Sequence, residues 1–251
     1  MGEKKNVILN LNPLTQIEMV VLLAFIALLF DYRISTVVLC VMIGMACAAG
    51  ILKPFLSMWM KTIVFITVVV FIMQLFFLPG ETEIWSFWIF SIKQESLSNA
   101  ISVCTRLLGV GTAAVLGIQM VNVDKLVIVL EEKGLSASAT YVLLSTVNII
   151  PQMSKKMKVI MDAQKSRGIE TESNIWVRAK AFFPTIGPLI LNSIVNAEER
   201  TITLEARGFT APVKKTRLHS IEDSGADKIL RKIFLLIFII VIVGRVVLWI
   251  V

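Results

Sequence analysis

Long apolar runs constrain the fold of this chain more than any other feature. A helix needs about 20 mostly apolar residues to cross the hydrocarbon core of a bilayer, because each residue adds about 1.5 Å. Five segments meet or approach this length, at residues 13–30, 34–52, 62–78, 97–120 and 233–251. The mean hydropathy of +0.80 and the 56% of hydrophobic residues are also typical of a membrane protein. The sequence therefore predicts an all-α integral membrane protein with about five transmembrane helices.

The segment between the fourth and fifth runs has a different character. Residues 121–232 contain 17 lysines and arginines and 12 acidic residues, and no uncharged apolar run there is long enough to span a bilayer. The nearest candidate, residues 181–197, is interrupted by two prolines and two asparagines. We therefore expect transmembrane helices in residues 1–120, a set of amphipathic helices in residues 121–232, and a last transmembrane helix in residues 233–251.

The distribution of basic residues predicts the orientation of the spans. With the N-terminus in the cytoplasm, 21 of the 25 lysines and arginines fall on the cytoplasmic side. Cytoplasmic loops of membrane proteins are rich in basic residues, so this orientation is favoured over its inverse. The same distribution accounts for the net charge of +7, and we expect no nucleic-acid partner.

Residue types that usually carry catalysis or metal binding are scarce. The three cysteines, Cys40, Cys47 and Cys104, all lie in apolar runs, and His219 is the only histidine. These residues provide neither a disulfide framework nor the spacing of a metal site. The sequence also lacks a P-loop pattern. We therefore expect a chain that is not an enzyme, binds no metal or cofactor and does not hydrolyse ATP by itself.

Small residues recur in the fourth apolar run. Gly109, Ala113 and Gly117 are four residues apart, on one face of the expected helix. Small side chains at this spacing allow helix backbones to approach closely in lipid. Arg106 lies in the same run, and a charge at the centre of a bilayer costs about 2.5–3.5 kcal/mol on insertion. We expect Arg106 to face protein or the cytoplasmic segment rather than lipid.

A long helix is predicted for residues 136–166, with a bend at Pro151. Beyond the bend, Met153, Met157 and Met161 are four residues apart on one face, whereas lysines occupy other faces. Methionine fills irregular cores, and it also adapts readily to binding partners. The methionine stripe is therefore either core packing or a contact face for a partner.

Two triplets in this basic segment end helix-like runs with arginine followed by glycine. Glycine just after a helix is typical of a C-terminal cap, and arginine there complements the negative end of the helix dipole. Arginine also forms paired hydrogen bonds with carboxylates, so each tip suits an acidic groove in a partner protein. The members are Ser166, Arg167 and Gly168 in the first triplet, and Ala206, Arg207 and Gly208 in the second, which follows a helix expected at residues 189–206.

These motifs give the chain a resemblance to a known family. The chain resembles the T component of energy-coupling factor (ECF) transporters, in the cobalt-transport permease family, through DAQKSRGIE, PLILNSIVNAEERTITLEARGF and KKTRL. Weaker support comes from LNPLTQ and TRLLGVGTAAVLGIQ. The resemblance extends over nearly the whole chain, so it implies a single domain over residues 1–251. The first triplet departs from the family pattern, because it has serine where alanine is usual.

The resemblance implies a division of labour among separate proteins. Two ATP-binding ABC subunits hydrolyse ATP, a small S component in the membrane binds a vitamin or a transition metal, and the T component links them. Residues 166–168 would engage one ATPase and residues 206–208 the other, through coupling helices at the cytoplasmic surface. The implied location is the plasma membrane of a prokaryote, as a multi-pass protein, with ATP bound only by the partner subunits.

Other functions remain open from the residues alone. A permease subunit of a conventional ABC transporter would form a substrate path itself and pair with a second copy. A membrane scaffold unrelated to transport would not copurify with nucleotide-binding subunits. A membrane enzyme would need a nucleophile, a base or a metal cluster near the membrane surface, and a single histidine argues against it.

Overall fold

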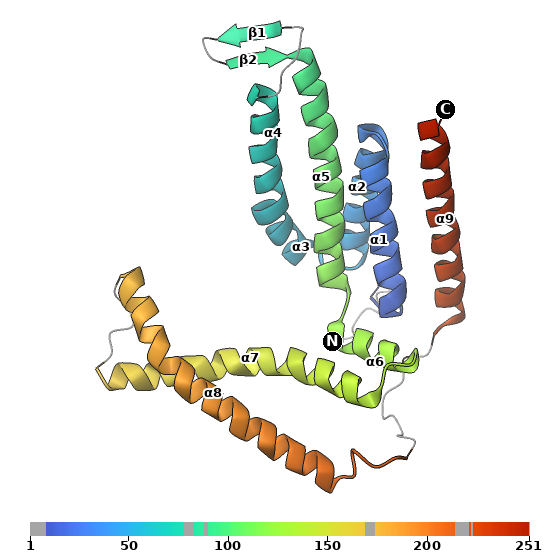
Figure 1. Cartoon of the computed structure of the whole chain (residues 1–251). Coiled ribbons are helices and arrows are strands. Elements are labelled where there is room, and N and C mark those ends of the chain that lie inside the picture. Colours follow the sequence, from blue (N-terminus) through green and yellow to red (C-terminus); the bar gives the residue numbers. More distant parts are fainter. Residues whose placement is uncertain are drawn as a thin grey trace. The chain divides into compact units, whose positions relative to one another are not determined.

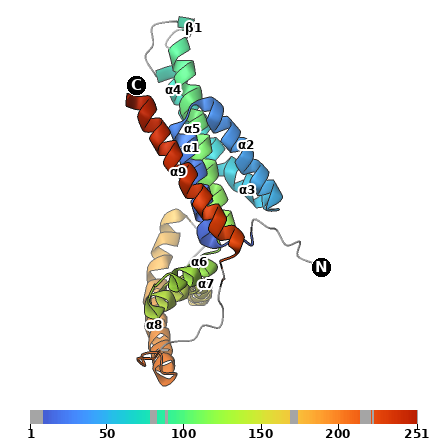
Figure 2. The same cartoon turned by 90° about the vertical axis from the view of Figure 1, so that its right-hand side faces the viewer.

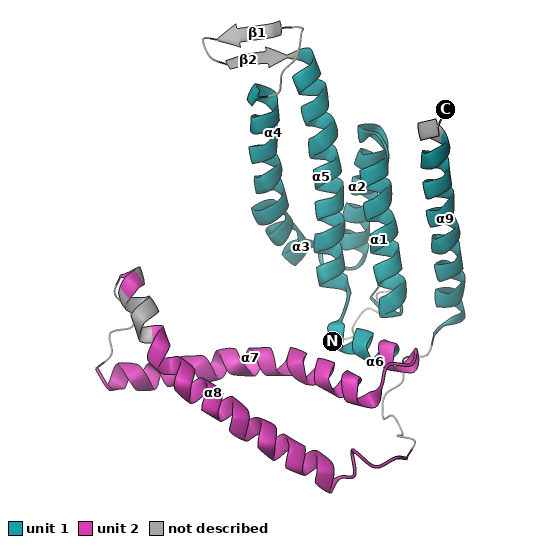
Figure 3. Cartoon of the chain, viewed as in Figure 1, with its two compact units in different colours: residues 1–129, 221–251 teal, residues 130–220 magenta. Residues whose placement is uncertain are grey.

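The computed structural model describes residues 9–77, 83–87, 90–168, 174–213, 221 and 223–250. The chain divides into two compact units, which Figure 3 shows in teal and magenta. Unit 1 comprises residues 1–129 and 221–251, and unit 2 comprises residues 130–220. Unit 2 thus falls within the basic segment of the sequence, between the apolar runs that build unit 1.

Unit 1 is built around the long helix α5. This helix packs against α1, α2 and α4, and α9 packs against α1 (Figures 1 and 2). The helices α3 and α4 are joined through a π-helical turn, η1, into one continuous helix. The elements are α1 (Pro13–Leu29), α2 (Tyr32–Ala48), α3 (Leu52–Trp59), η1 (Met60–Val64), α4 (Phe65–Phe77), β1 (Glu83–Phe87), β2 (Phe90–Lys93), α5 (Gln94–Met120), the first part of α6 (Val123–Glu132) and α9 (Gly225–Ile250).

The helices of unit 1 expose much of their apolar surface. Within the described residues, two of them, Leu52–Phe77 and Gln94–Met120, are long and apolar enough to cross a membrane, and α1 and α2 are shorter apolar helices. Only 6% of the apolar window of Leu52–Phe77 is buried within the chain. A core helix of a soluble protein would be buried on most sides, so this uncovered surface indicates a helical membrane protein.

The structure corrects the prediction for residues 53–61. The apolar runs at residues 34–52 and 62–78 leave these residues outside the expected spans, in a connecting turn, but α3 is helical and leads into η1 without a break. Pro54 is the third residue of α3, where a backbone N–H has no acceptor within the helix, so proline is tolerated. The chain turns earlier, at Gly50, whose φ of 73° suits glycine.

A short hairpin is a second departure from the prediction of an all-α chain. The strands β1 and β2 pair in the antiparallel sense between α4 and α5, with Phe87 opposite Phe90. Aromatic and β-branched residues are common in this stretch, and they favour strands. The chain is therefore mainly helical, with one small sheet in its described part.

The predicted close approach of small residues on α5 is confirmed. A Cβ atom added to Gly109 would lie 2.6 Å from the Cβ of Ala27 in α1, which is closer than real Cβ atoms approach. A Cβ on Gly117 would lie 3.2 Å from Cγ1 of Val20. Glycine at these positions therefore lets α1 and α5 pack backbone against backbone.

Replacing Gly109 with alanine should destabilise unit 1. The added methyl group has no room, and overpacking of this kind costs about 1–3 kcal/mol. The matched control is Gly44→Ala in α2, where no atom lies within 4 Å of the added Cβ. Thermal unfolding of the detergent-solubilised protein measures both changes. We expect a lower Tm for Gly109→Ala and an unchanged or higher Tm for Gly44→Ala; equal values would contradict this account of the α1–α5 contact.

A cluster of polar side chains, which we call the clasp, joins the N-terminal ends of α1 and α9. The backbone N–H of Asn12 donates to Oδ1 of Asp227 at 3.1 Å, and Nδ2 of Asn12 donates to Oδ1 of Asp223 at 2.6 Å. Arg231 binds both carboxylate oxygens of Asp223, at 2.7 and 3.2 Å, and its Nε donates to Oγ1 of Thr15 at 2.9 Å. Asn12, Thr15 and Asp227 are buried. Because these groups satisfy one another, the clasp fixes the start of α9 against the start of α1.

Unit 2 consists mainly of two long helices, α7 (Ala137–Ser166) and α8 (Ile175–Ala206). The extent of α7 agrees with the prediction. By contrast, α8 begins well before the helix expected at residues 189–206 and runs through Pro184 and Pro188. Each proline removes a single backbone donor, and α8 stays helical through both positions.

Candidate partner-docking site

The second arginine–glycine corner, at the end of α8, is a complete glycine cap. Gly208 has a φ of 71°, in the left-handed region. Its N–H donates to the carbonyl oxygen of Glu205 at 2.9 Å, and the N–H of Phe209 donates to that of Leu204 at 2.9 Å. These two bonds define the Schellman motif, which satisfies carbonyl groups at a helix end. The prediction that Gly208 caps the helix is confirmed.

The first corner, at the end of α7, follows the same pattern. Arg167 is the C-cap residue, and its N–H donates to the carbonyl oxygen of Gln164 at 3.0 Å. Gly168 has a φ of 87°, and its N–H donates to the carbonyl oxygen of Lys165 at 3.0 Å. The next residue along the chain lies outside the described residues, so the second bond of the motif is not described. The glycine again accounts for the end of the helix.

Two other helix ends show that the cap does not require arginine. Gly50 and Gly134 also have positive φ values, of 73° and 115°, and each follows a helix. The same cap bonds form there, although the preceding residues are Ala49 and Lys133. Glycine alone is therefore enough for the turn, and the arginines at the two corners need a further explanation.

Arg167 and Arg207 are both exposed. In the part of the chain that the structure describes, neither side chain forms a hydrogen bond or an ion pair. By contrast, Lys133, at the end of α6, does have an interaction within the chain. Both arginines are therefore free to bind carboxylates of another protein, for which their planar fork is well suited.

An aromatic contact fixes the second corner against α7. The rings of Phe209 and Tyr141 lie 5.4 Å apart between centroids, at an angle of 56°. Tyr141 is near the start of α7, whereas Arg167 directly follows its end, 26 residues later. At 1.5 Å per residue this spacing corresponds to about 39 Å along the helix. The two arginine tips therefore lie at opposite ends of the α7–α8 pair (Figure 1) and form two separate sites.

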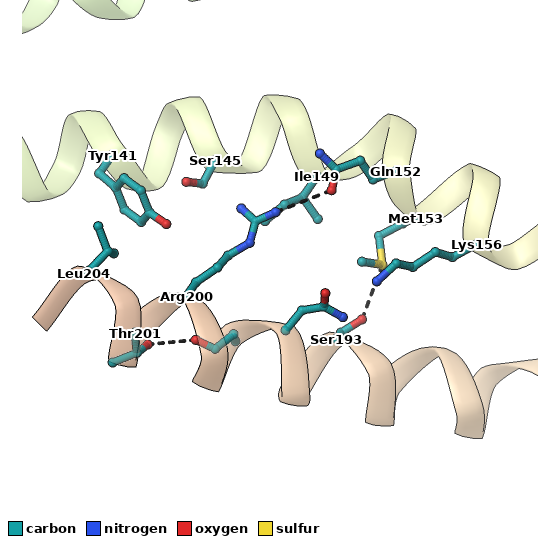
Figure 4. A pocket seen from close by; sticks show the side chains of 12 residues that line it. Tyr141, Ser145, Ile149, Gln152, Met153, Lys156, Ser193, Arg200, Thr201 and Leu204 are labelled. Carbon is teal, nitrogen blue, oxygen red and sulfur yellow. Dashed lines mark hydrogen bonds between the residues drawn. The ribbon is translucent and has the colours of Figure 1, made fainter. Parts of the chain in front are cut away.

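A cleft of about 270 Å³ lies between α7 and α8 (Figure 4). Within it, Oγ of Ser193 donates to Sδ of Met153 at 3.3 Å, and Nη2 of Arg200 donates to Oε1 of Gln152 at 3.4 Å. Tyr141, near the start of α7, meets Phe209, just beyond the end of α8, whereas Met153, near the middle of α7, meets Ser193, near the middle of α8, so the two helices run antiparallel. Met153 packs against α8 within this chain, which favours core packing for the first member of the methionine stripe.

The other two methionines continue the same stripe further along α7, and both are partly exposed. Because successive residues turn by about 100° around a helix, each four-residue step turns the stripe by about 40°, so Met157 and Met161 lie further round from the cleft than Met153, on the side of the exposed Leu143 and Ile150. The exposed apolar residues of α8 also form a face that points away from the cleft. Because the two helices run antiparallel, helical spacing places the apolar faces of α7 and α8 on the same side of the helix pair. We call this surface the apolar platform; it comprises Val142, Leu143, Ile150, Met157 and Met161 of α7 and Leu191, Ile194, Val195 and Ile202 of α8.

Several of these residues were not identified from the sequence. Tyr141 gave no signal, because its contact with Phe209 joins positions 68 residues apart. The apolar residues of α8 were considered only as a failed span, although exposed apolar positions on one face of a helix are typical of an interaction surface. The structure thus adds a broad apolar surface to the two charged tips predicted from the sequence.

Comparison with known proteins gives the class of the chain. Residues 4–218 match the CbiQ profile, which is described as cobalt transport protein. The match extends over most of the chain, so the chain belongs to the CbiQ family of cobalt transport proteins.

Curated relatives add a more particular description. The chain is similar to proteins named "Energy-coupling factor transporter transmembrane protein EcfT" from three bacteria. The protein from Lactococcus lactis subsp. cremoris is 25% identical, over 71% of this chain and 68% of the relative. That from Ruminiclostridium cellulolyticum is 26% identical over 82% of each chain. That from Bacillus selenitireducens is 24% identical, over 92% of this chain and 90% of the relative.

Proposed function

We propose that this chain is the transmembrane energy-coupling subunit of an ECF-type ABC importer, and that Arg167 and Arg207 dock in two ATP-binding subunits. The observation that carries the proposal is the pair of exposed arginines, each directly before a glycine cap, at opposite ends of one helix pair. The tips at Arg167 and Arg207 are about 39 Å apart along α7. This separation suits two partner sites rather than one. The names of the relatives place the same kind of subunit in energy-coupling factor transporters.

The apolar platform is the proposed contact surface for the substrate-binding S component in the membrane. Exposed apolar residues such as Ile150 (62%) and Leu191 (66%) have no cover within unit 2. A membrane partner would cover them without the cost of leaving apolar surface in water. In this arrangement the S component binds the vitamin or transition metal, and this chain transmits the effect of ATP hydrolysis without binding a cofactor or catalysing a reaction.

The proposed topology has five spans in the plasma membrane of a prokaryote, with the N-terminus in the cytoplasm. The apolar parts of α1, α2, Leu52–Phe77, α5 and α9 form the spans, and α6 to α8 form the coupling helices at the cytoplasmic surface. The support is the distribution of basic residues in the sequence, which assigns 21 of 25 to the cytoplasmic side if Lys53 and Lys61, at the start of the helix Leu52–Phe77, are counted there.

Purification in mild detergent tests the proposal as a whole. We expect an affinity-tagged form of this chain to copurify with ATP-binding subunits and with a small membrane protein that binds the substrate. Quantitative mass spectrometry of the purified complex identifies these proteins and gives their ratio. A complex that contains two copies of this chain and no separate S component would indicate a conventional ABC permease. Purification without any nucleotide-binding subunit would indicate a scaffold unrelated to transport.

A further inference from the structure

Two adjoining hollows lie between α1 and α9, in unit 1. The larger has a volume of about 500 Å³ and the smaller about 240 Å³. Glu18 of α1 and Leu235 of α9 line both hollows, so together they form one groove. We call this groove the α1–α9 groove.

The groove exists because α9 is held to α1 at two separate levels. The clasp joins the helices at their N-terminal ends, through Asp223 and Arg231. Further along, the rings of Phe25 and Phe238 meet edge to face, with centroids 5.1 Å apart. Between these two contacts, no described side chain fills the space beside Glu18.

The groove combines apolar walls with charges at one end. Its walls are the apolar side chains Val21, Leu22, Phe234, Leu235, Leu236, Phe238, Ile239 and Ile240. Its charged residues all lie toward the N-terminal ends of the helices, where the apolar sequence begins. Arg231 is bound to Asp223 in the clasp, whereas Glu18 and Lys232 are exposed and form no ion pair in the described part of the chain. A carboxylate and an ammonium group thus face the same hollow without neutralising each other.

We propose that the α1–α9 groove binds a phospholipid whose headgroup carries a primary ammonium, such as phosphatidylethanolamine. The acyl chain lies along the apolar walls, the phosphate meets Lys232, and the ammonium donates hydrogen bonds to Glu18. An anionic headgroup would bring a second negative charge toward Glu18. A quaternary ammonium headgroup, as in phosphatidylcholine, has no N–H to donate. A lipid of the proposed kind brings both charges on one molecule, whereas a partner helix would have to place two oppositely charged side chains at the same level.

Lipid titration of the full chain tests this proposal. The protein is delipidated in detergent and titrated with phosphatidylethanolamine, phosphatidylcholine or phosphatidylglycerol of the same acyl composition, and bound lipid is counted by native mass spectrometry. We expect phosphatidylethanolamine to bind about tenfold more tightly than the other two, the effect of one charge-assisted hydrogen bond. Glu18→Gln and Lys232→Gln should each remove most of this preference.

The matched control is Lys228→Gln, a change at an exposed lysine one turn earlier in α9 that does not line the groove. It should leave the preference for phosphatidylethanolamine unchanged. The circular dichroism spectrum of each variant checks that its helices are intact. Equal binding of the three lipids, or a preference that survives both groove variants, would overturn the proposal. Displacement of the bound lipid by an added membrane partner would likewise overturn it, because the groove would then be a protein interface.

Discussion

Replacing both Arg167 and Arg207 with alanine should release the ATP-binding subunits while the protein remains folded in the membrane. A charge-assisted hydrogen-bonded contact to a partner contributes about 1.5–3 kcal/mol. The two sites are far apart and share no residue, so their effects should add to about 3–6 kcal/mol, or roughly 10²- to 10⁴-fold in affinity. A cap role alone would cost about 0.3–1 kcal/mol per arginine. The loss of affinity is measured by how much of the ATP-binding subunits stays on the tagged complex. Its effect on transport is measured by ATP-driven uptake in liposomes.

Two controls separate docking from capping. Lys133→Ala removes a basic residue from the same position before a glycine cap, at the end of α6, and should leave ATPase retention unchanged. Arg167→Lys and Arg207→Lys should restore the contact only in part, because lysine keeps the charge but lacks the planar fork. Full uptake by the double alanine variant would show that both corners are caps and nothing more.

Replacing both Met157 and Met161 with lysine in one variant should detach the S component but leave the ATPases bound. Both methionines belong to the apolar platform, and an unpaired charge buried in an apolar interface costs several kcal/mol. We expect the amount of S component that copurifies to fall at least about tenfold, since each 1.4 kcal/mol changes a binding constant tenfold. Met153 stays unchanged in this variant, because it packs against Ser193 of α8.

Val159→Lys provides the matched control for the platform. Val159 is also apolar and exposed, at 68%, but it lies on the opposite face of α7 from Met157. Its replacement should leave the S component bound. If the double lysine variant retains the S component as well as the wild type does, the platform contacts lipid rather than a protein.

Local patterns predicted much of this structure from the sequence. The apolar runs gave the positions of α1, α2, α4 and α5, because a membrane helix is recognised from composition and length alone. The glycine caps at Gly168 and Gly208 were predicted because a cap depends on a few neighbouring residues. The predicted roles of the triplets at these caps in binding ATPases stay predictions.

Two kinds of feature could not be predicted from the sequence: contacts between residues far apart in the chain, and prolines that lie inside a helix. The clasp joins Asn12 to Asp227, 215 residues away, and no local pattern reports such a pair. The second apolar run was expected to continue to residue 52, close to Pro54, but α2 ends at Ala48 and Pro54 lies in the first turn of α3, where proline is tolerated. The helix α8 continues through Pro184 and Pro188, so its start was also placed too late. In each case the missing information concerned neighbours in space or position within a helix, rather than residue type.

Site-directed cross-linking tests the central claim most directly. Cysteine replaces Ser166 or Ala206, each next to an arginine tip, in a chain whose own three cysteines have been changed to alanine. A short cross-linker is then added to the assembled complex, with Leu191→Cys on the apolar platform for comparison. The account predicts that positions 166 and 206 each link to an ATP-binding subunit, that a doubly substituted chain links two such subunits at once, and that position 191 links to the S component. An intact complex in which neither 166 nor 206 links to an ATP-binding subunit would contradict it.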